Sequence, residues 1–102
     1  MKNKGTLITN FAKLGEFTAY SEQAYNAAYC RYALMHNLSQ TLMRLRDDIN
    51  SPFTENSLQA ELESIVRADR EMRAALAQAN EAAALCGKPP LHLHDLTRAR
   101  KG

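Results

Sequence analysis

The sequence predicts an all-α fold: an antiparallel two-helix hairpin with long helices at about residues 10–49 and 54–86. Two long stretches contain neither glycine nor proline, and both place apolar residues at helical spacing. Only the turn-forming cluster Asn50-Ser51-Pro52-Phe53 separates them. A connection this short makes consecutive helices antiparallel neighbours, and the chain is short enough for a single domain of residues 1–102.

The apolar pattern of both stretches alternates spacings of three and four residues. A strand would alternate every two residues, whereas this spacing is typical of helices packed along a common seam. The first seam comprises Leu14, Phe17, Ser21, Ala24, Ala28, Arg31, Met35, Leu38, Leu42, Leu45 and Ile49. The second comprises Leu58, Leu62, Ile65, Asp69, Met72, Leu76, Ala79, Ala83 and Cys86.

Local signals predict where the helices end. Thr54 is a suitable N-cap for the second helix, and Gly87 followed by Pro89-Pro90 is a strong stop signal. The first 15 residues leave two alternatives open. They form a separate short helix that ends at Gly15, or they extend the first arm from about residue 9 or 10; we favour the extension.

One charged residue interrupts each seam, Arg31 in the first helix and Asp69 in the second. Folding the hairpin about residue 52 brings them within about one helical turn of each other. A charge on a packed seam costs free energy unless it is paired, so we hypothesise that they form an ion pair. In the alternative, Asp69 pairs with Arg73 along its own helix and Arg31 extends outward to solvent.

Aromatic and small residues are sorted onto different arms. All seven aromatic residues precede residue 54, whereas the second arm is rich in alanine. One stripe of the first helix, displaced from the seam, is formed by Tyr25, Tyr29, Tyr32 and His36, and Met43 continues it. Either the tyrosines lean over the alanine face with their hydroxyls in water, or the stripe binds a partner. Because an isolated hairpin buries little surface, we favour a partner site, either for another protein or for dimerisation into a four-helix arrangement.

Charge is segregated along the chain. Residues 1–15 and 87–102 each have a net charge of +3, whereas both helix bodies are net acidic, so the hairpin has basic terminal segments, 1–9 and 87–102. In an antiparallel hairpin these ends converge at the open end, which would offer a nucleic acid or an acidic protein a basic surface. The residues concerned are Lys2, Lys4, Lys13, Lys88, Arg98, Arg100 and Lys101. The alternative, which we favour, is that the tails are solvated and disordered.

The segment from Pro89 to Leu96 alternates apolar residues outside the predicted helices. It either folds back on the hairpin, with Leu96 in a short final turn, or docks in an extended form on a partner. The sequence does not separate these alternatives.

Catalytic and cofactor motifs are absent from the sequence. The spacing of Cys86, His92, His94 and Asp95 matches no zinc pattern, and Cys30 and His36 lie on different faces of one helix. We therefore expect two free thiols, no metal, no cofactor and no enzymatic activity. No apolar run reaches the roughly 20 residues that span a bilayer and no signal peptide is evident, so we expect a cytoplasmic protein.

Together these features favour a small, non-enzymatic interaction module that regulates another protein. An accessory inhibitor from a phage or plasmid, acting on a host protein, is one such role. The alternative function is association with nucleic acid through the basic open end.

Overall fold

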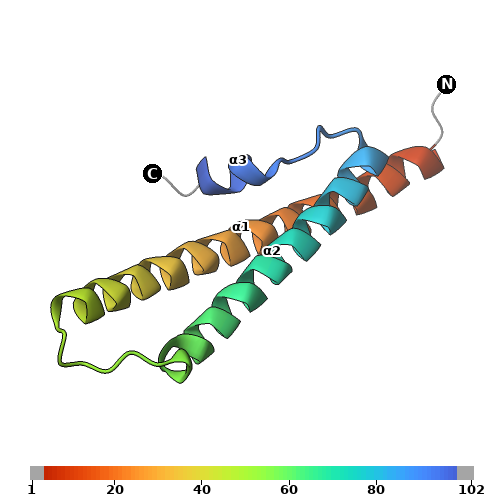
Figure 1. Cartoon of the computed structure of the whole chain (residues 1–102). Helices are drawn as coiled ribbons and strands as arrows, with labels where there is room; N and C mark the ends of the chain where they lie inside the picture. The colour runs from red at the N-terminus through yellow and green to blue at the C-terminus, as the bar shows by residue number, and fades with distance from the viewer. Residues whose placement is uncertain (1–3, 99–102) are drawn as a thin grey trace.

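The computed structural model describes residues 4–98, and it describes side chains from Phe11 to Thr97. The chain is all-α, as predicted (Figure 1). Helix α1 (Lys4–Asp47) and helix α2 (Gln59–Cys86), which a 3-10 turn η1 (Glu55–Leu58) precedes, pack antiparallel as a hairpin, and a short helix α3 (Leu93–Arg98) follows. Within residues 4–98, no helix combines the length and the apolar character that crossing a membrane requires.

Helix α1 begins earlier and ends earlier than predicted. It starts at Lys4 and runs through Gly15 without a break, so residues 4–15 extend the first arm and form no separate helix. A Cβ atom at Gly15 would meet nothing within 4 Å, so no packing contact requires the glycine. The helix ends at Asp47 because the side chain of Asp48 accepts hydrogen bonds from the Asn50 backbone N–H at 3.2 Å and the Ser51 hydroxyl at 2.9 Å.

This early end corrects the prediction for Ile49. Assigned to the seam from its spacing, Ile49 lies instead in the connection between the helices and is 90% exposed. The connection runs from Asp48 to Thr54, so it is longer than the four-residue cluster. At its far end, the Thr54 backbone N–H donates to the Ser57 hydroxyl at 3.3 Å, which supports Thr54 as the cap of the 3-10 turn.

The C-terminal end of α2 is the one that the sequence predicts. Gly87 has φ 79°, the left-handed conformation that glycine adopts without a Cβ penalty. The Lys88 backbone N–H donates to the Ala83 carbonyl at 3.0 Å, which closes a Schellman-type cap. The chain therefore leaves α2 in a sharp turn immediately before the two prolines.

The packed face of α2 is rotated from the predicted seam. Its buried residues are Ile65, Ala68, Met72, Ala75, Ala79, Ala82 and Ala83. Leu62, which the spacing placed in the seam, is 50% exposed, and Leu76 is only partly buried. Alanine lets two helices approach closely, so the interface uses Ala68, Ala75 and Ala82 in preference to the leucines beside them.

The C-terminal segment folds back on the hairpin as helix α3, which settles the alternatives that the sequence left open. The Asn80 amide donates to the Leu91 carbonyl at 3.0 Å, and its oxygen accepts from the Leu91 N–H at 2.7 Å. The His92 N–H donates to the Asp95 carboxylate at 2.9 Å at the start of α3. Leu96 is 0% exposed in a cluster with Ala24, Ala28, Met72 and Ala75, so this part of the tail is ordered.

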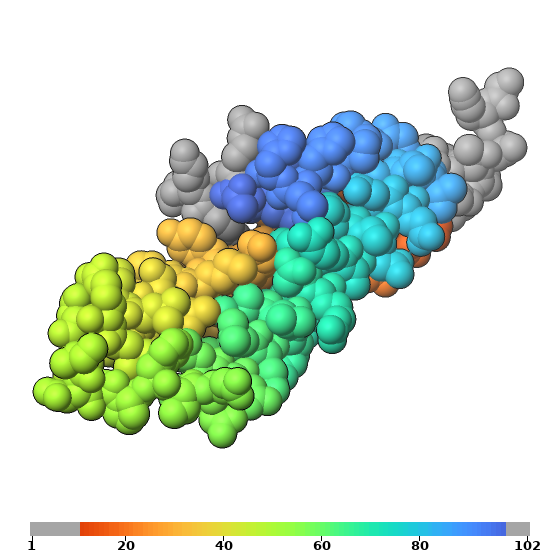
Figure 2. Space-filling model, viewed as in Figure 1, coloured from red at the N-terminus to blue at the C-terminus, as the bar shows by residue number. Residues whose placement is uncertain are grey.

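The molecule is long and flat, with Cα extents of 74 × 26 × 14 Å. Helix α3 runs back along one side of the hairpin toward the turn but stops well short of it (Figure 1, Figure 2). We call residues 11–32 of α1 and 69–86 of α2 the open half, and residues 33–47, the connection, η1 and residues 59–68 the turn half. Within residues 4–98, the open half alone has a third layer.

Candidate functional site

Three surfaces of the hairpin are candidate sites: a polar groove opposite α3, an aromatic edge on α1, and an apolar face on the turn half. Each is formed by side chains at helical spacing, so each is held by rigid backbone rather than by loops. An ion-pair network of Arg31, Asp69 and Arg73 joins the two helices.

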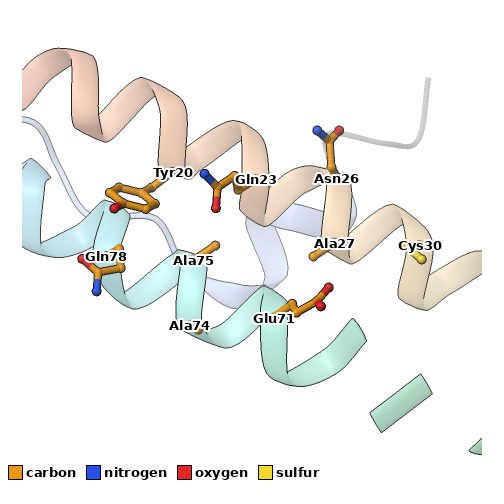
Figure 3. Close-up of a pocket in the computed structure, with 9 residues that line it drawn as sticks. All are labelled: Tyr20, Gln23, Asn26, Ala27, Cys30, Glu71, Ala74, Ala75 and Gln78. Atoms are coloured by element: carbon orange, nitrogen blue, oxygen red, sulfur yellow. The ribbon is translucent and has the colours of Figure 1, made fainter. Parts of the chain in front are cut away.

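The polar groove lies between α1 and α2 and has a volume of about 560 Å³ (Figure 3). Tyr20, Gln23 and Ala27 of α1 face Ala75, Gln78 and Glu71 of α2 across it. Its lining is completed by Asn26, Cys30 and Ala74. The residue spacing did not predict this groove, because polar residues at helical spacing are usual on any solvated helix face.

The groups that line the groove are mainly hydrogen-bonding groups. Amide, phenol and carboxylate groups suit peptide-like ligands, and no histidine lines the groove to activate the Cys30 thiol. Cys30 and Cys86 are both free thiols, as predicted.

The aromatic edge consists of Tyr29, Tyr32 and His36, three exposed residues of the predicted stripe. Tyr29 is 54% exposed and Tyr32 is 66% exposed, and the Tyr32 ring stacks on His36 with centroids 6.5 Å apart and planes 7° apart. Tyr32 and His36 also line a hollow of about 240 Å³ beside Thr97 of α3. Helix α3 therefore forms one wall of the hollow next to the aromatic edge.

The structure divides the predicted stripe into three environments. Tyr25 packs against the cluster around Leu96, so it is largely structural. Tyr29, Tyr32 and His36 form the aromatic edge. Met43 lies farther along, in an apolar hollow of about 430 Å³ with Met35, Leu38, Ser39, Leu42 and Arg46. Tyr25 is therefore covered within the chain, because α3 packs there.

Both proposed partners of Asp69 contact it. Arg31 Nε donates to Asp69 Oδ1 at 2.8 Å across the interface, and Arg73 Nε donates to Oδ2 at 2.9 Å along α2. The pairings of both alternatives therefore coexist, and Arg31 binds Asp69 instead of extending outward to solvent. The hydrogen bond from Arg73, and then that from Arg31, hold the pKa of Asp69 below its ordinary value of 3.8, although partial desolvation opposes them.

Two of the seven basic residues, Lys13 and Lys88, have described side chains, and both lie toward the open end. Lys88 follows α2 there, and Lys13 of α1 pairs with Glu16 at 3.2 Å. Arg98, however, is carried back along the hairpin at the end of α3, next to Thr97, which lies beside Tyr32 and His36. The backbone of Arg98 therefore lies away from the open end, because the chain reverses after Gly87. Lys4 belongs to α1 through its backbone, and Lys2, Arg100 and Lys101 lie outside the described residues.

The histidines of the tail lie side by side. The rings of His92 and His94 stack with centroids 5.8 Å apart, and His94 Nε2 is 3.5 Å from Asp95 Oδ1. Over the part of the chain that the structure describes, no three side chains of metal-binding type come together.

Comparison with known proteins adds no family to this description. No protein-family description, no curated protein and no solved structure matches the chain.

Proposed function

We propose that this chain is a small, non-enzymatic interaction module that binds and regulates another protein through the aromatic edge of α1. The observation that supports this most directly is the exposure of Tyr29 and Tyr32 on successive turns of one helix. Tyrosine provides a large contact area at a low cost in side-chain entropy, which is why it is enriched at binding hot spots.

The arrangement of the edge supports recognition of a protein surface. The stacking of Tyr32 on His36 reduces the freedom of both rings before binding. The hollow beside Thr97 would receive one side chain of a partner next to these rings. Regulation of a host protein by a phage or plasmid factor is one role that fits a module of this size.

Affinity purification from the native host tests this function, with the tagged wild-type chain compared with Tyr29→Ala/Tyr32→Ala. We expect a protein retained by the wild type to be lost from the double variant, while both chains keep the same helical circular dichroism. Phe53→Ala, which removes another exposed ring in the connection, should retain the partner.

Two results would contradict the proposal. Either no protein is enriched over a tag-only control, or the double variant keeps the partner. A double variant that loses helical signal together with the partner would instead assign the tyrosines a structural role.

Nucleic-acid binding through the basic ends is the second candidate, and it has less support. Its premise was one basic cluster at the open end, whereas Arg98 is carried away from that end on α3. Binding that weakens steeply with salt and disappears when residues 88–102 are removed would favour it over the first candidate.

A further inference from the structure

The hollow beside the aromatic edge continues the apolar contact that holds α3. Leu96 is fully buried in a cluster that contains Ala28 and Met72. The same two residues line the hollow of about 240 Å³, together with Met35. Thr97, the residue that follows Leu96, forms the wall on the side of α3. The hollow therefore extends an interface that already accepts a leucine, and a second aliphatic side chain fits its chemistry.

An excess of positive charge borders the hollow. The side chain of Arg31 lines the hollow, and its Nε donates to Asp69 at 2.8 Å. Arg73 Nε donates to the other oxygen of the same carboxylate at 2.9 Å. Two guanidinium groups thus share one carboxylate, which leaves one positive charge in excess. Because a guanidinium has five N–H donors, it can bind more than one carboxylate.

The sequence adds positive charge directly after the wall of the hollow. Arg98, Arg100 and Lys101 follow Thr97 within four positions, and residues 98–102 contain no acidic residue. Among the described residues that line the hollow, none is acidic. Charge complementarity therefore favours an acidic partner. A nucleic acid would also meet this charge, but its phosphate backbone offers no aliphatic group for the hollow.

We propose that the hollow beside the aromatic edge binds an acidic segment of the partner protein. A leucine-like side chain of that segment enters the hollow, and a neighbouring carboxylate binds Arg31. The stacked rings of Tyr32 and His36, which also line the hollow, then pack against the segment. This inference rests on the proposed function, because it names the chemistry of the partner at that same site.

An NMR titration of the isotope-labelled full chain with the blocked peptide acetyl-Glu-Glu-Leu-Glu-Glu-amide tests this site. We expect saturable shifts of the amide signals of Ala28, Tyr32, Met72 and Thr97. A peptide with alanine in place of leucine should bind about tenfold more weakly, because less apolar surface is buried. A peptide with lysine in place of every glutamate should cause no saturable shift at these four amides.

One pair of variants tests the charge at the hollow. His36→Glu adds a negative charge at an exposed position of the lining, so it should weaken binding of the acidic peptide by about tenfold. Asn37→Glu is the matched control, because it adds the same charge at the next exposed position, which is not part of the lining. It should bind the peptide like the wild type. Both variants should keep the helical circular dichroism of the wild type.

Several outcomes would overturn the inference. The first is an absence of saturable shifts at the four amides, and the second is equal binding of the leucine and alanine peptides. Shifts confined to residues after Thr97 would assign binding to the basic tail alone. Shifts of the four amides with a single-stranded oligothymidylate, but not with the peptide, would assign the site to nucleic acid. Peptide binding without any host protein captured in the affinity purification would count only against the proposed function.

Discussion

The open half and the turn half of the hairpin are made from the same two helices, yet they are packed to different degrees. In the open half, Leu96 seals a cluster of Ala24, Ala28, Met72 and Ala75. In the turn half, no residue of α1 beyond Ala28 is buried among those that the structure describes, and Met35, Leu42 and Leu62 remain partly exposed. The difference is the third layer, which α3 supplies at one end only.

This comparison shows why small residues determine where α3 packs on the hairpin. Alanines leave a space between two helices that a leucine from a third element fills, and fully burying a leucine stabilises a fold by about 1.5–3 kcal/mol. On the turn half, the larger side chains of Met35, Leu42 and Leu62 stay partly exposed instead. Within the described residues, the open half thus has a third layer and the turn half has none.

The largest expected effect is at Leu96. Truncation by Leu96→Ala leaves a cavity in the alanine-floored cluster, so we expect a loss of about 2–5 kcal/mol in the free energy of unfolding. Leu42→Ala in the turn half should cost less than about 1 kcal/mol, because that side chain is already 42% exposed. Urea denaturation followed by circular dichroism, at a concentration where the chain is monomeric, measures both. Equal losses would show that the two halves are packed alike.

A smaller effect is expected at Asn80, whose side chain fixes the start of the return segment. Asn80→Ala removes both hydrogen bonds to Leu91, so we expect a loss of about 1–3 kcal/mol and faster amide exchange in α3 than in the wild type. Asn80→Asp is the matched control. It keeps the acceptor for the Leu91 N–H and should fall between the other two. Unchanged exchange in α3 of the Ala variant would mean that Leu96 alone holds the helix in place.

The smallest effect is expected at the ion-pair network, which lies where the halves meet. The pKa of Asp69 is lower in the folded chain than in the unfolded one, so its contribution to stability is present above about pH 4. That contribution is lost as the pH falls through the lower, folded-state pKa. Asp69→Asn should remove this component of the acid dependence.

The two arginines can be ranked in the same experiment. Arg73 is the larger cause of the lowered pKa, so Arg73→Ala should raise the pKa of Asp69 more than Arg31→Ala does. Carboxyl-carbon NMR titration of the folded chain measures the two shifts. The reverse order would make the contact across the helices the dominant one.

The elements of the fold followed from local signals. The 3-4 spacing, the stop at Gly87 and the cap at Thr54 each depend on residues within one or two helical turns. They can therefore be recognised from the amino-acid sequence alone. The charges at Arg31 and Asp69 were also informative, because a charged residue on a packed face needs a partner within reach. Even so, the spacing did not predict that Asp48 would end α1 before Ile49, since that depends on a side-chain turn competing with the helix.

Tertiary structure alone decided which faces pack and where the tail lies. Two overlapping stripes on α2 both have helical spacing, and the choice of Ala68, Ala75 and Ala82 over Leu62 depends on how closely α1 approaches. Helix α3 is too short to be stable by itself, so it exists because Leu96 finds a site formed by residues far away in sequence. The sequence by itself determined a hairpin. The packing of small and large side chains among α1, α2 and α3 decided that α3 covers the open half and leaves the turn half uncovered.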